Sequence, residues 1–500
     1  MKFERSAGII LHPTSLPGPD GIGDLGPDAY DWIDFLHETG CRLWQVLPLG
    51  PTGYGDSPYQ CFSAFAGNPN LISAALLLAE GLLAESDLSD RPELPSAAVD
   101  YGPVIEWKRT VLNRAFGNFS AAPSPSLAKE MRAFAKKQAA WLEDAALFLA
   151  IKENLEGQPW NAWPKGLRDR QPEALAAFRK EHQNELQRQV FRQFLFFRQW
   201  SALKKYANGK GIQVIGDIPI FVAYDSADAW AHRELFFLDA DGSPTVVAGV
   251  PPDYFSPTGQ LWGNPLYNWE AHRSRNYSWW VERIRSTLQL FDILRLDHFR
   301  GFAGYWEVPA GMSTAEKGRW VKGPGLEFFQ AIQNALGDLP IIAEDLGEIT
   351  PDVIELRDML GLPGMKILQF AFSDPLNKFL PHAYPENCIA YTGTHDNDTS
   401  IGWYRSTPEK EADFCRRYLA RSGEDIAGDM MRAVWSSVAV YALCPLQDLL
   451  RLGTEARMNF PGRLGGNWSW RFDAAQLTAE VASQLTEMNF LYARSGEEET

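Results

Sequence analysis

Short apolar runs recur along the chain, and each of them ends in polar or glycine-rich residues. Runs that are apolar on both faces are typical of strands buried in a parallel sheet. Most are followed by segments with helical apolar spacing, and Thr350-Pro351 starts one of these as an N-cap and a first helical residue. The runs that we predict to be strands are residues 8–11, 43–47, 212–220, 291–297, 339–344, 366–372 and 388–392.

This alternation of strands and helices predicts an α/β protein, and we expect a (β/α)8 TIM barrel rather than a doubly wound sheet. The polar residues collect at the C-terminal ends of several predicted strands, which is where barrel active sites lie. The glycine fingerprint of dinucleotide-binding folds and the P-loop motif are both missing. We expect a single catalytic domain over residues 1–500, without a C-terminal β-sandwich.

Two long segments depart from the alternation. Residues 80–205 carry helical apolar spacing and predict a helical insertion between early barrel strands. Residues 223–280 are rich in glycine, proline and aromatic side chains. They predict an ordered loop insertion that acts as a lid rather than a linker.

Composition narrows the classes of partner. The formal net charge is −16 and no cluster of Lys and Arg stands out, so nucleic acid and anionic membranes are poor partners, whereas neutral sugars are easier to accommodate. No apolar stretch is long enough for a spanning helix or a signal peptide. The five cysteines are odd in number and form no CxxC pair, which favours reduced thiols. We therefore expect a cytoplasmic protein without a cofactor.

The first candidate for chemistry is the motif Arg295-Leu-Asp-His298 at the end of one predicted strand. Strand alternation places Ile293, Arg295 and Asp297 on one face. A cation within ~4–6 Å of a carboxylate holds it ionised, as a nucleophile or an electrostatic stabiliser requires. Taken alone, the pair is also typical of a structural ion pair.

The second candidate is Glu344, which ends the apolar run 339–344. Partial desolvation at the end of such a strand raises the pKa of a carboxyl group towards that of a useful general acid. The alternative is that Glu344 and Asp345 only cap the loop that follows the strand.

The third candidate is the motif Thr394-His-Asp-Asn397. Its polar side chains could suggest a metal site, but no HExxH motif accompanies them and the eight histidines are scattered, so we expect no metal. A His and an Asp at a strand end can instead bind vicinal sugar hydroxyls. In a barrel, Asp297, Glu344 and Asp396 would end strands four, five and seven and converge on one mouth. Two carboxyls ~5–5.5 Å apart there would give a retaining double displacement.

Four strand-end motifs stand in order along the chain, namely residues 216–222, 295–298, 343–346 and 394–397. They resemble the four signature regions of the α-amylase clan and, within it, those of the amylomaltases, or 4-α-glucanotransferases. The resemblance runs over almost the full length. Its further segments are residues 11–17, 44–53, 55–60, 249–256, 259–265, 297–301, 455–459 and 461–462.

This resemblance implies an enzyme that transfers α-1,4-glucan segments among maltooligosaccharides and larger glucans. Asp297 would be the nucleophile, Glu344 the acid/base, and Asp396 the residue that binds the 2- and 3-hydroxyls of the attacked sugar. The same motifs leave open an α-glucan hydrolase, which differs in using water for the second step. A glucan-binding regulatory protein is disfavoured because all three carboxylates and Arg295 are present.

The resemblance also implies which other residues contact the glucan. Arg295 would orient Asp297, and Asp217 matches an early strand-end Asp that is structural. The residues expected near the sugar at the cleaved bond are Tyr59, His298 and His395. Tyr254 and Trp262 fall in the segment 223–280, which is similar to a substrate-enclosing loop, whereas Tyr54 and Tyr101 match a second glucan-contact site remote from the chemistry.

Overall fold

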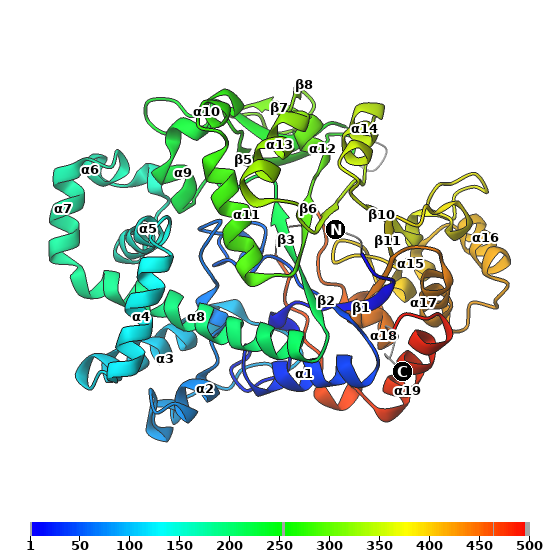
Figure 1. Ribbon diagram of the computed structural model, residues 1–500, viewed down its shortest axis with the longest axis horizontal. Helices are drawn as coiled ribbons and strands as arrows, with labels where there is room; N and C mark the ends of the chain where they lie inside the picture. The colour runs from blue at the N-terminus through cyan, green and yellow to red at the C-terminus, as the bar shows by residue number, and fades with distance from the viewer. Residues whose placement is uncertain (1–2, 253–255, 464, 496–500) are drawn as a thin grey trace.

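Eight parallel strands form a nearly closed barrel in the computed structural model, which describes residues 3–252, 256–463 and 465–495 (Figure 1). Around the sheet the order is β10-β11-β12-β1-β2-β3-β6-β9, and the N–H of Ala343 donates to the carbonyl of Pro363 at 2.9 Å across the remaining gap. The predicted (β/α)8 barrel is confirmed. The strands are β1 (Ser6–Ile10), β2 (Leu43–Gln45), β3 (Gln213–Pro219), β6 (Ile293–Asp297), β9 (Ile341–Ala343), β10 (Gly364–Ile367), β11 (Cys388–Tyr391) and β12 (Tyr441–Pro445).

Each of the seven predicted runs overlaps one of these strands. The eighth strand, β12, was not predicted, although it is fully buried and pairs with both β1 and β11. The run at residues 366–372 is a strand only at its start, because a 3-10 helix (Leu368–Phe370) follows β10 directly.

One layer of apolar side chains fills the barrel interior. Every strand contributes to it, through Ile10, Leu43, Ile215, Ile293, Ile342, Met365, Ile389 and Leu443. Because side chains in a strand alternate between the two faces, the residue two positions further on also points inward. After Ile215, Ile293 and Ile342, those positions hold Asp217, Arg295 and Glu344. The strand period therefore stacks a polar layer on the apolar one at the C-terminal end of the barrel.

Helices cover the outside of the barrel. The helices that lie between and after the barrel strands include α1 (Pro27–Glu38), α11 (Ser278–Leu290), α13 (Gly325–Leu336), α14 (Pro351–Met359), α15 (Ser400–Ser406), α16 (Glu409–Leu419), α17 (Ile426–Ser436) and α19 (Ala479–Leu491). Helix α14 starts with Pro351 after Thr350, as the sequence predicts. No helix within the described ranges is both long and apolar enough to cross a membrane.

The segment 80–205 lies on one side of the barrel and is mostly helical (Figure 1). Its long last helix, α8, continues to residue 209 and packs on α5, α4 and α3 before the chain enters β3. The helices of this segment are α3 (Tyr101–Ala121), α4 (Pro125–Lys137), α5 (Leu142–Asn154), α6 (Lys165–Arg168), α7 (Pro172–Glu181) and α8 (Gln183–Gly209).

The segment 223–280 has more regular structure than its composition indicated. It holds α9 (Ala227–Ala231), β4 (Val246–Val250), β5 (Gln260–Pro265) and α10 (Trp269–Ser274). Strand β4 pairs with β5 and also with β7 (Gly304–Pro309), which pairs in turn with β8 (Arg319–Lys322). The result is a four-stranded antiparallel sheet. Strands β7 and β8 lie beyond Asp297, so no pattern inside residues 223–280 could show the pairing of β4 with β7.

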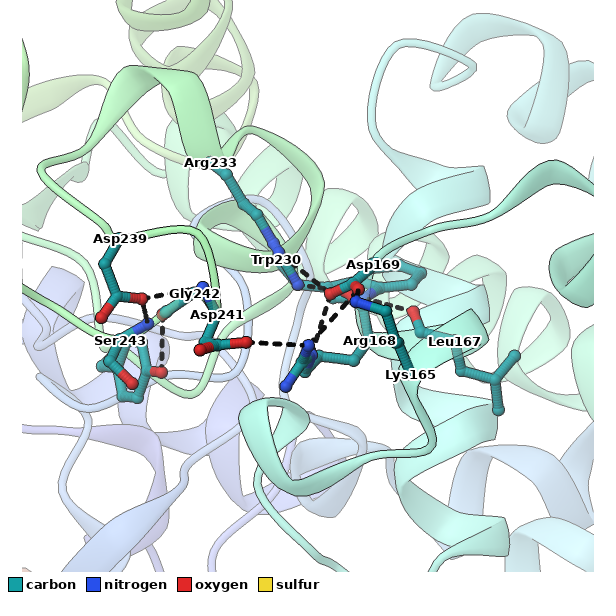
Figure 2. Close-up of polar contacts among 11 residues, drawn as sticks. Lys165, Leu167, Arg168, Asp169, Trp230, Arg233, Asp239, Asp241, Gly242 and Ser243 are labelled. Atoms are coloured by element: carbon teal, nitrogen blue, oxygen red, sulfur yellow. Dashed lines mark hydrogen bonds and ion pairs between the residues drawn. The ribbon is translucent and has the colours of Figure 1, made fainter.

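An ionic cluster fastens the helical segment 80–205 to the segment 223–280 (Figure 2). Asp169, just after α6, accepts from Nε of Arg168 at 2.8 Å and from Nη1 of Arg233 at 3.3 Å. Arg168 also reaches Oδ1 of Asp241 at 3.2 Å, in the turn that leads to β4. The two segments therefore hold each other in place beside the barrel.

Candidate active site

Three carboxylates stand at the C-terminal end of the barrel. Asp297 is the last residue of β6, Glu344 follows β9 directly, and Asp396 lies in the loop after β11. These are the fourth, fifth and seventh strands along the chain, and all of them run parallel. The fold therefore brings the three predicted carboxylates to one mouth.

Asp297 is held by a buried chain of polar contacts. Arg295 is only 4% exposed, and its Nη2 lies 3.0 Å from Oδ1 of Asp297. Its Nη1 donates to Oδ2 of Asp217, which also accepts from the hydroxyl of Tyr59 at 2.8 Å. One guanidinium is therefore shared between two carboxylates, and the sequence predicted only one of these partners.

The sharing of Arg295 affects the ionisation of Asp297. Burial raises the pKa of Asp297 to about 6, with Arg295 opposing this effect and Asp217 and Asp396 adding to it. A lone ion pair would instead lower the pKa of the carboxyl below its usual range. Asp297 is still mostly ionised at pH 7, but its pKa lies closer to 7 than the sequence suggested.

Glu344 lies in an environment that favours its protonated form. Burial and the neighbouring Asp297 raise its pKa to about 8, against the opposing effects of Arg295 and two backbone N–H groups. Those groups are the N–H of His298, 2.7 Å from Oε2, and the N–H of Leu346, 3.0 Å from Oε1. Asp345 instead accepts from the N–H of Met365 at 2.7 Å and forms an ion pair with Arg357 of α14. Of the two neighbouring acids, only Glu344 is a candidate proton donor.

The turn after Asp297 connects it to Glu344. The backbone of His298 has a φ of 52°. This is the left-handed region, which residues other than glycine adopt rarely, and strained backbone of this kind clusters at functional sites. With this turn, the N–H of Phe299 donates to the carbonyl of Glu344 at 3.1 Å. The His298 ring meets Trp262 of β5 edge to face, with ring centroids 4.7 Å apart. The antiparallel sheet therefore reaches the barrel mouth through Trp262.

Asp396 has different surroundings from the other two carboxylates. Its Oδ1 accepts from Nδ2 of Asn459 at 2.6 Å, and its Oδ2 lies 3.4 Å from Nε2 of His395. Burial alone would raise its pKa, but the contacts with His395 and Asn459 hold the pKa below its usual range. The side chain is 47% exposed. Asp396 is thus an ionised acceptor open to a ligand.

Tyr59 and His395 pack against each other beside the carboxylates. Their ring centroids are 5.2 Å apart with an interplanar angle of 17°, and both rings contact Trp468. The stack therefore joins residues from three distant parts of the chain. It fixes the ring of His395 while the hydroxyl of Tyr59 holds Asp217.

The predicted second contact site is only partly accessible. Tyr54 is 74% exposed. Tyr101 is buried, and its hydroxyl donates to the carbonyl of Trp468 at 2.8 Å. Burial raises the pKa of Tyr101, and the nearby Asp56, two residues from Tyr54, adds to the effect. Tyr254 lies outside the described residues.

Three polar residues near the site were not predicted as functional. Asn459 holds Asp396, and Nη2 of Arg457 donates to the carbonyl of Asp396 at 2.6 Å. The motif at residues 455–459 was the only sequence signal for Arg457 and Asn459. His12, two residues after β1, is buried near His395, and burial lowers its pKa to about 3.

The possible metal ligands do not gather. Within residues 3–252, 256–463 and 465–495, no three His, Cys, Asp or Glu side chains form a group that could hold a metal ion. Asp398 instead accepts from the hydroxyl of Thr454 at 2.9 Å.

The chain matches a known family over nearly its whole length. A family model described as 4-alpha-glucanotransferase matches residues 11–477. The chain belongs to the 4-alpha-glucanotransferase family. Relatives of that name include one from Thermus thermophilus, 52% identical over 98% of this chain and 99% of its own length. Another, from Synechocystis sp., is 49% identical over 99% of both chains.

Solved structures agree with this family assignment. An amylomaltase from Streptococcus agalactiae in complex with acarbose matches with a TM-score of 0.95 and 42% identity, over 98% of this chain and all of the other. An amylomaltase from Corynebacterium glutamicum has a TM-score of 0.78 at 18% identity, over 98% of this chain and 74% of its own, which shows the shared fold. The family that the strand-end motifs resemble is confirmed.

Proposed function

We infer that the three carboxylates at the barrel mouth carry out the transfer that gives the family its name. As a member, the chain is a 4-α-glucanotransferase, which moves α-1,4-glucan segments from one glucan to the 4-hydroxyl of another. The observation that carries the assignment of roles is the contrast in contacts: Asp297 pairs with the buried guanidinium of Arg295 at 3.0 Å, whereas Glu344 accepts from the backbone N–H groups of His298 and Leu346. Asp297 is mostly ionised at pH 7, whereas Glu344, with a pKa of about 8, keeps its proton. Such a pair suits a nucleophile and a general acid.

The first half of the reaction forms a covalent intermediate. A carboxylate oxygen of Asp297 attacks C1 of a glucose unit of the donor, and the bond from C1 to the bridging oxygen breaks. Glu344 gives its proton to that oxygen, which leaves as the 4-hydroxyl of the departing glucan. Arg295 keeps the attacking carboxylate in position through its contact with Asp297.

The second half reverses these roles. Glu344, now ionised, takes the proton from the 4-hydroxyl of an acceptor glucan. The acceptor oxygen forms a bond to C1 as the bond from C1 to Asp297 breaks. Two displacements at C1 restore the α configuration. Water in place of the acceptor would give hydrolysis.

The remaining site residues bind the sugar that is attacked. Asp396 is placed to accept hydrogen bonds from two neighbouring hydroxyls, as an ionised and half-exposed carboxylate. His395, beside it, and His298, in the turn after Asp297, are placed to donate to the same ring. Trp262 offers an apolar face next to His298. Tyr54 and Tyr101 stay proposed as a second glucan contact.

The proposed partners are maltooligosaccharides and larger α-1,4-glucans, as both donor and acceptor, and the proposed location is the cytoplasm. Five free thiols support a reducing compartment. Fractionation of the source cells, with transfer activity as the marker, tests the location.

Incubation with maltotriose tests the function. Transfer produces a ladder of longer oligosaccharides together with glucose, while the total number of reducing ends stays constant. A steady rise in reducing ends without longer products would identify a hydrolase instead.

A further inference from the structure

A single helical turn, α18 (Leu446–Leu449), follows the last barrel strand β12 directly and lies close to α15 (Figure 1). All four of its residues are buried, and two of them, Gln447 and Asp448, are polar. Asp448 is only 1% exposed. A carboxyl group is costly to bury unless it is hydrogen-bonded. The partners of Asp448 therefore show which part of the fold it holds.

Three hydrogen bonds join Asp448 to the two ends of the loop that carries Asp396. Thr392, the residue after β11, donates from its hydroxyl to Oδ2 of Asp448 at 2.5 Å. Ser400, the first residue of α15, donates from its N–H to Oδ1 and from its hydroxyl to Oδ2, both at 2.7 Å. Thr392 and Ser400 are themselves fully buried. One carboxylate thus ties together the residues on either side of the loop 393–399.

The residue before Asp448 holds the other side of Asp396. Nε2 of Gln447 donates to the carbonyl of Ala456 at 3.1 Å. The two residues that contact Asp396 from the C-terminal part of the chain, Arg457 and Asn459, come shortly after Ala456. The same helical turn therefore contacts both the loop that carries Asp396 and the segment that holds it.

Asp396 depends on such contacts more than the other two carboxylates do. Asp297 is the last residue of β6 and Glu344 follows β9 directly, whereas Asp396 lies in a loop beyond the end of β11. Strand pairing fixes the first two, but it stops short of Asp396. Within the loop, Asp398 gives its carbonyl to Nε2 of Gln369 at 2.8 Å. A misplacement of about 1 Å can lower the rate of a reaction by about 10²-fold, so the ends of this loop have to be held.

We propose that Asp448 is a positioning residue for Asp396: by holding Thr392 and Ser400, it sets where the loop presents the Asp396 carboxylate to the sugar. The proposal rests on the proposed function, because it uses the role that Asp396 has there. Asp448 is buried beneath the loop ends and acts through Asp396, not on the sugar itself.

Two substitutions of Asp448 distinguish its hydrogen bonds from its charge. Asp448→Ala removes both acceptor oxygens, and kcat/KM for maltotriose should fall about tenfold. Asp448→Asn keeps one oxygen for the Ser400 N–H, and the hydroxyls of Thr392 and Ser400 can turn to accept from its amide, so the loss should stay within about threefold. Both losses should be equal for maltotriose and α-D-glucosyl fluoride, because Asp396 binds the sugar of either donor. An equal loss in both variants would contradict the proposal.

A double-mutant cycle with Asp396→Ala is the decisive experiment. Since Asp448 acts through Asp396, it should matter little once there is no carboxylate to place. Adding Asp448→Ala to Asp396→Ala should then lower kcat/KM by less than about threefold, against about tenfold in the wild-type background. Losses that multiply in full would overturn the proposal, because they would show that Asp448 acts independently of Asp396.

Asp292 provides a matched control at the opposite end of the barrel, just before β6. Its Oδ2 accepts from the N–H of Val214 at 2.9 Å and from Nδ2 of Asn208 at 2.8 Å. Asp292→Ala also removes hydrogen bonds from a neighbouring part of the fold, so it should lower Tm as Asp448→Ala does. It should leave kcat/KM within about twofold of the parent, with or without Asp396→Ala. Lower stability is thereby separated from lost positioning.

A second variant replaces Asp448→Ala in the cycle if that protein does not fold. Thr392→Val combined with Ser400→Ala removes both hydroxyl donors and leaves the N–H of Ser400 bound to Asp448. This variant should lose activity in the wild-type background and lose little more beside Asp396→Ala. Failure of the proposed function looks different: Asp396→Ala would be as active as the wild type, or the wild type would make no longer products from maltotriose, and the proposal would fall with it.

Discussion

Glu344 and Asp396 stand at the same end of the barrel, yet their surroundings move their pKa values in opposite directions. Burial and the neighbouring Asp297 raise the pKa of Glu344 to about 8, although two backbone N–H groups oppose them. Asp396 has His395 and Asn459, and its pKa falls below the usual range. The neighbours differ in charge: the carboxylate of Asp297 disfavours ionisation of Glu344, whereas the contacts with His395 and Asn459 favour ionisation of Asp396.

The contrast shows how one barrel mouth can hold acids with different tasks. A carboxyl that keeps its proton at pH 7 can donate it, and one that stays ionised can only accept hydrogen bonds. Asp297 lies between the two, with a pKa of about 6 set by burial against Arg295. On this account, exchanging an acid for its amide should have a different effect at each position.

The largest effect is expected for Asp297→Asn. The amide cannot form the covalent intermediate, so kcat/KM for maltotriose should fall by about 10⁴-fold or more. A disproportionation assay with separated products measures it. Asp352→Asn, at an exposed position of α14, should leave the rate unchanged. Retention of more than a tenth of the activity in Asp297→Asn would remove Asp297 from the reaction.

Glu344→Gln should cost less, about 10²–10⁴-fold in kcat/KM for maltotriose, which is the usual contribution of a general acid. The loss should depend on the leaving group. With α-D-glucosyl fluoride, whose fluoride leaves without a proton, release of fluoride in the first turnover should be close to the wild-type rate. Glu355→Gln on α14 is the control. An equal loss on both donors would show that Glu344 does not act as the acid.

Asp396→Asn should lower kcat/KM by about 10²-fold, since hydrogen bonds to a charged group contribute about 1.5–3 kcal/mol each. The loss should be similar for maltotriose and glucosyl fluoride, because Asp396 binds the sugar and transfers no proton. This pattern distinguishes it from Glu344. Full activity on the fluoride alone would contradict the comparison.

The smallest effect is the dependence of the wild type on pH. As pH rises through about 6, Asp297 loses its proton and kcat/KM should increase; above about 8, Glu344 loses its proton and kcat/KM should fall about tenfold per unit. Initial rates between pH 4 and pH 10 measure the profile. Its two apparent pKa values belong to Asp297 and Glu344 as a coupled pair. Glu344→Gln should lack the alkaline limb, and an alkaline limb that persists in this variant would have to come from another group.

The site was predictable from sequence where a short strand pattern decides it. Strand geometry predicts that Ile293, Arg295 and Asp297 share one face. In the structure, Ile293 packs in the barrel interior and Arg295 contacts Asp297. The second carboxylate on Arg295 could not be predicted, because Asp217 is on another strand and becomes a neighbour only when β3 pairs with β6. The contact between Tyr59 and Asp217 joins residues 158 positions apart.

The fold was predictable to a similar extent. Apolar runs identified seven barrel strands, but the short run in β12 was missed. The antiparallel sheet was missed because β4 and β7 are separated by barrel strand β6. Resemblance assigned Tyr101 to a glucan contact, while its burial and its bond to the Trp468 carbonyl depend on a C-terminal segment that returns to α3.

The central claim is that Asp297 forms a bond with the sugar while Glu344 and Asp396 do not. The most direct test uses Glu344→Gln with α-D-glucosyl fluoride, because this variant should form the intermediate and lack the base that removes it. After acid quenching and proteolysis, mass spectrometry should find one glucosyl group on the peptide that contains Asp297, attached at that residue. A glucosyl group on Asp396, or fluoride release without any labelled peptide, would contradict the account.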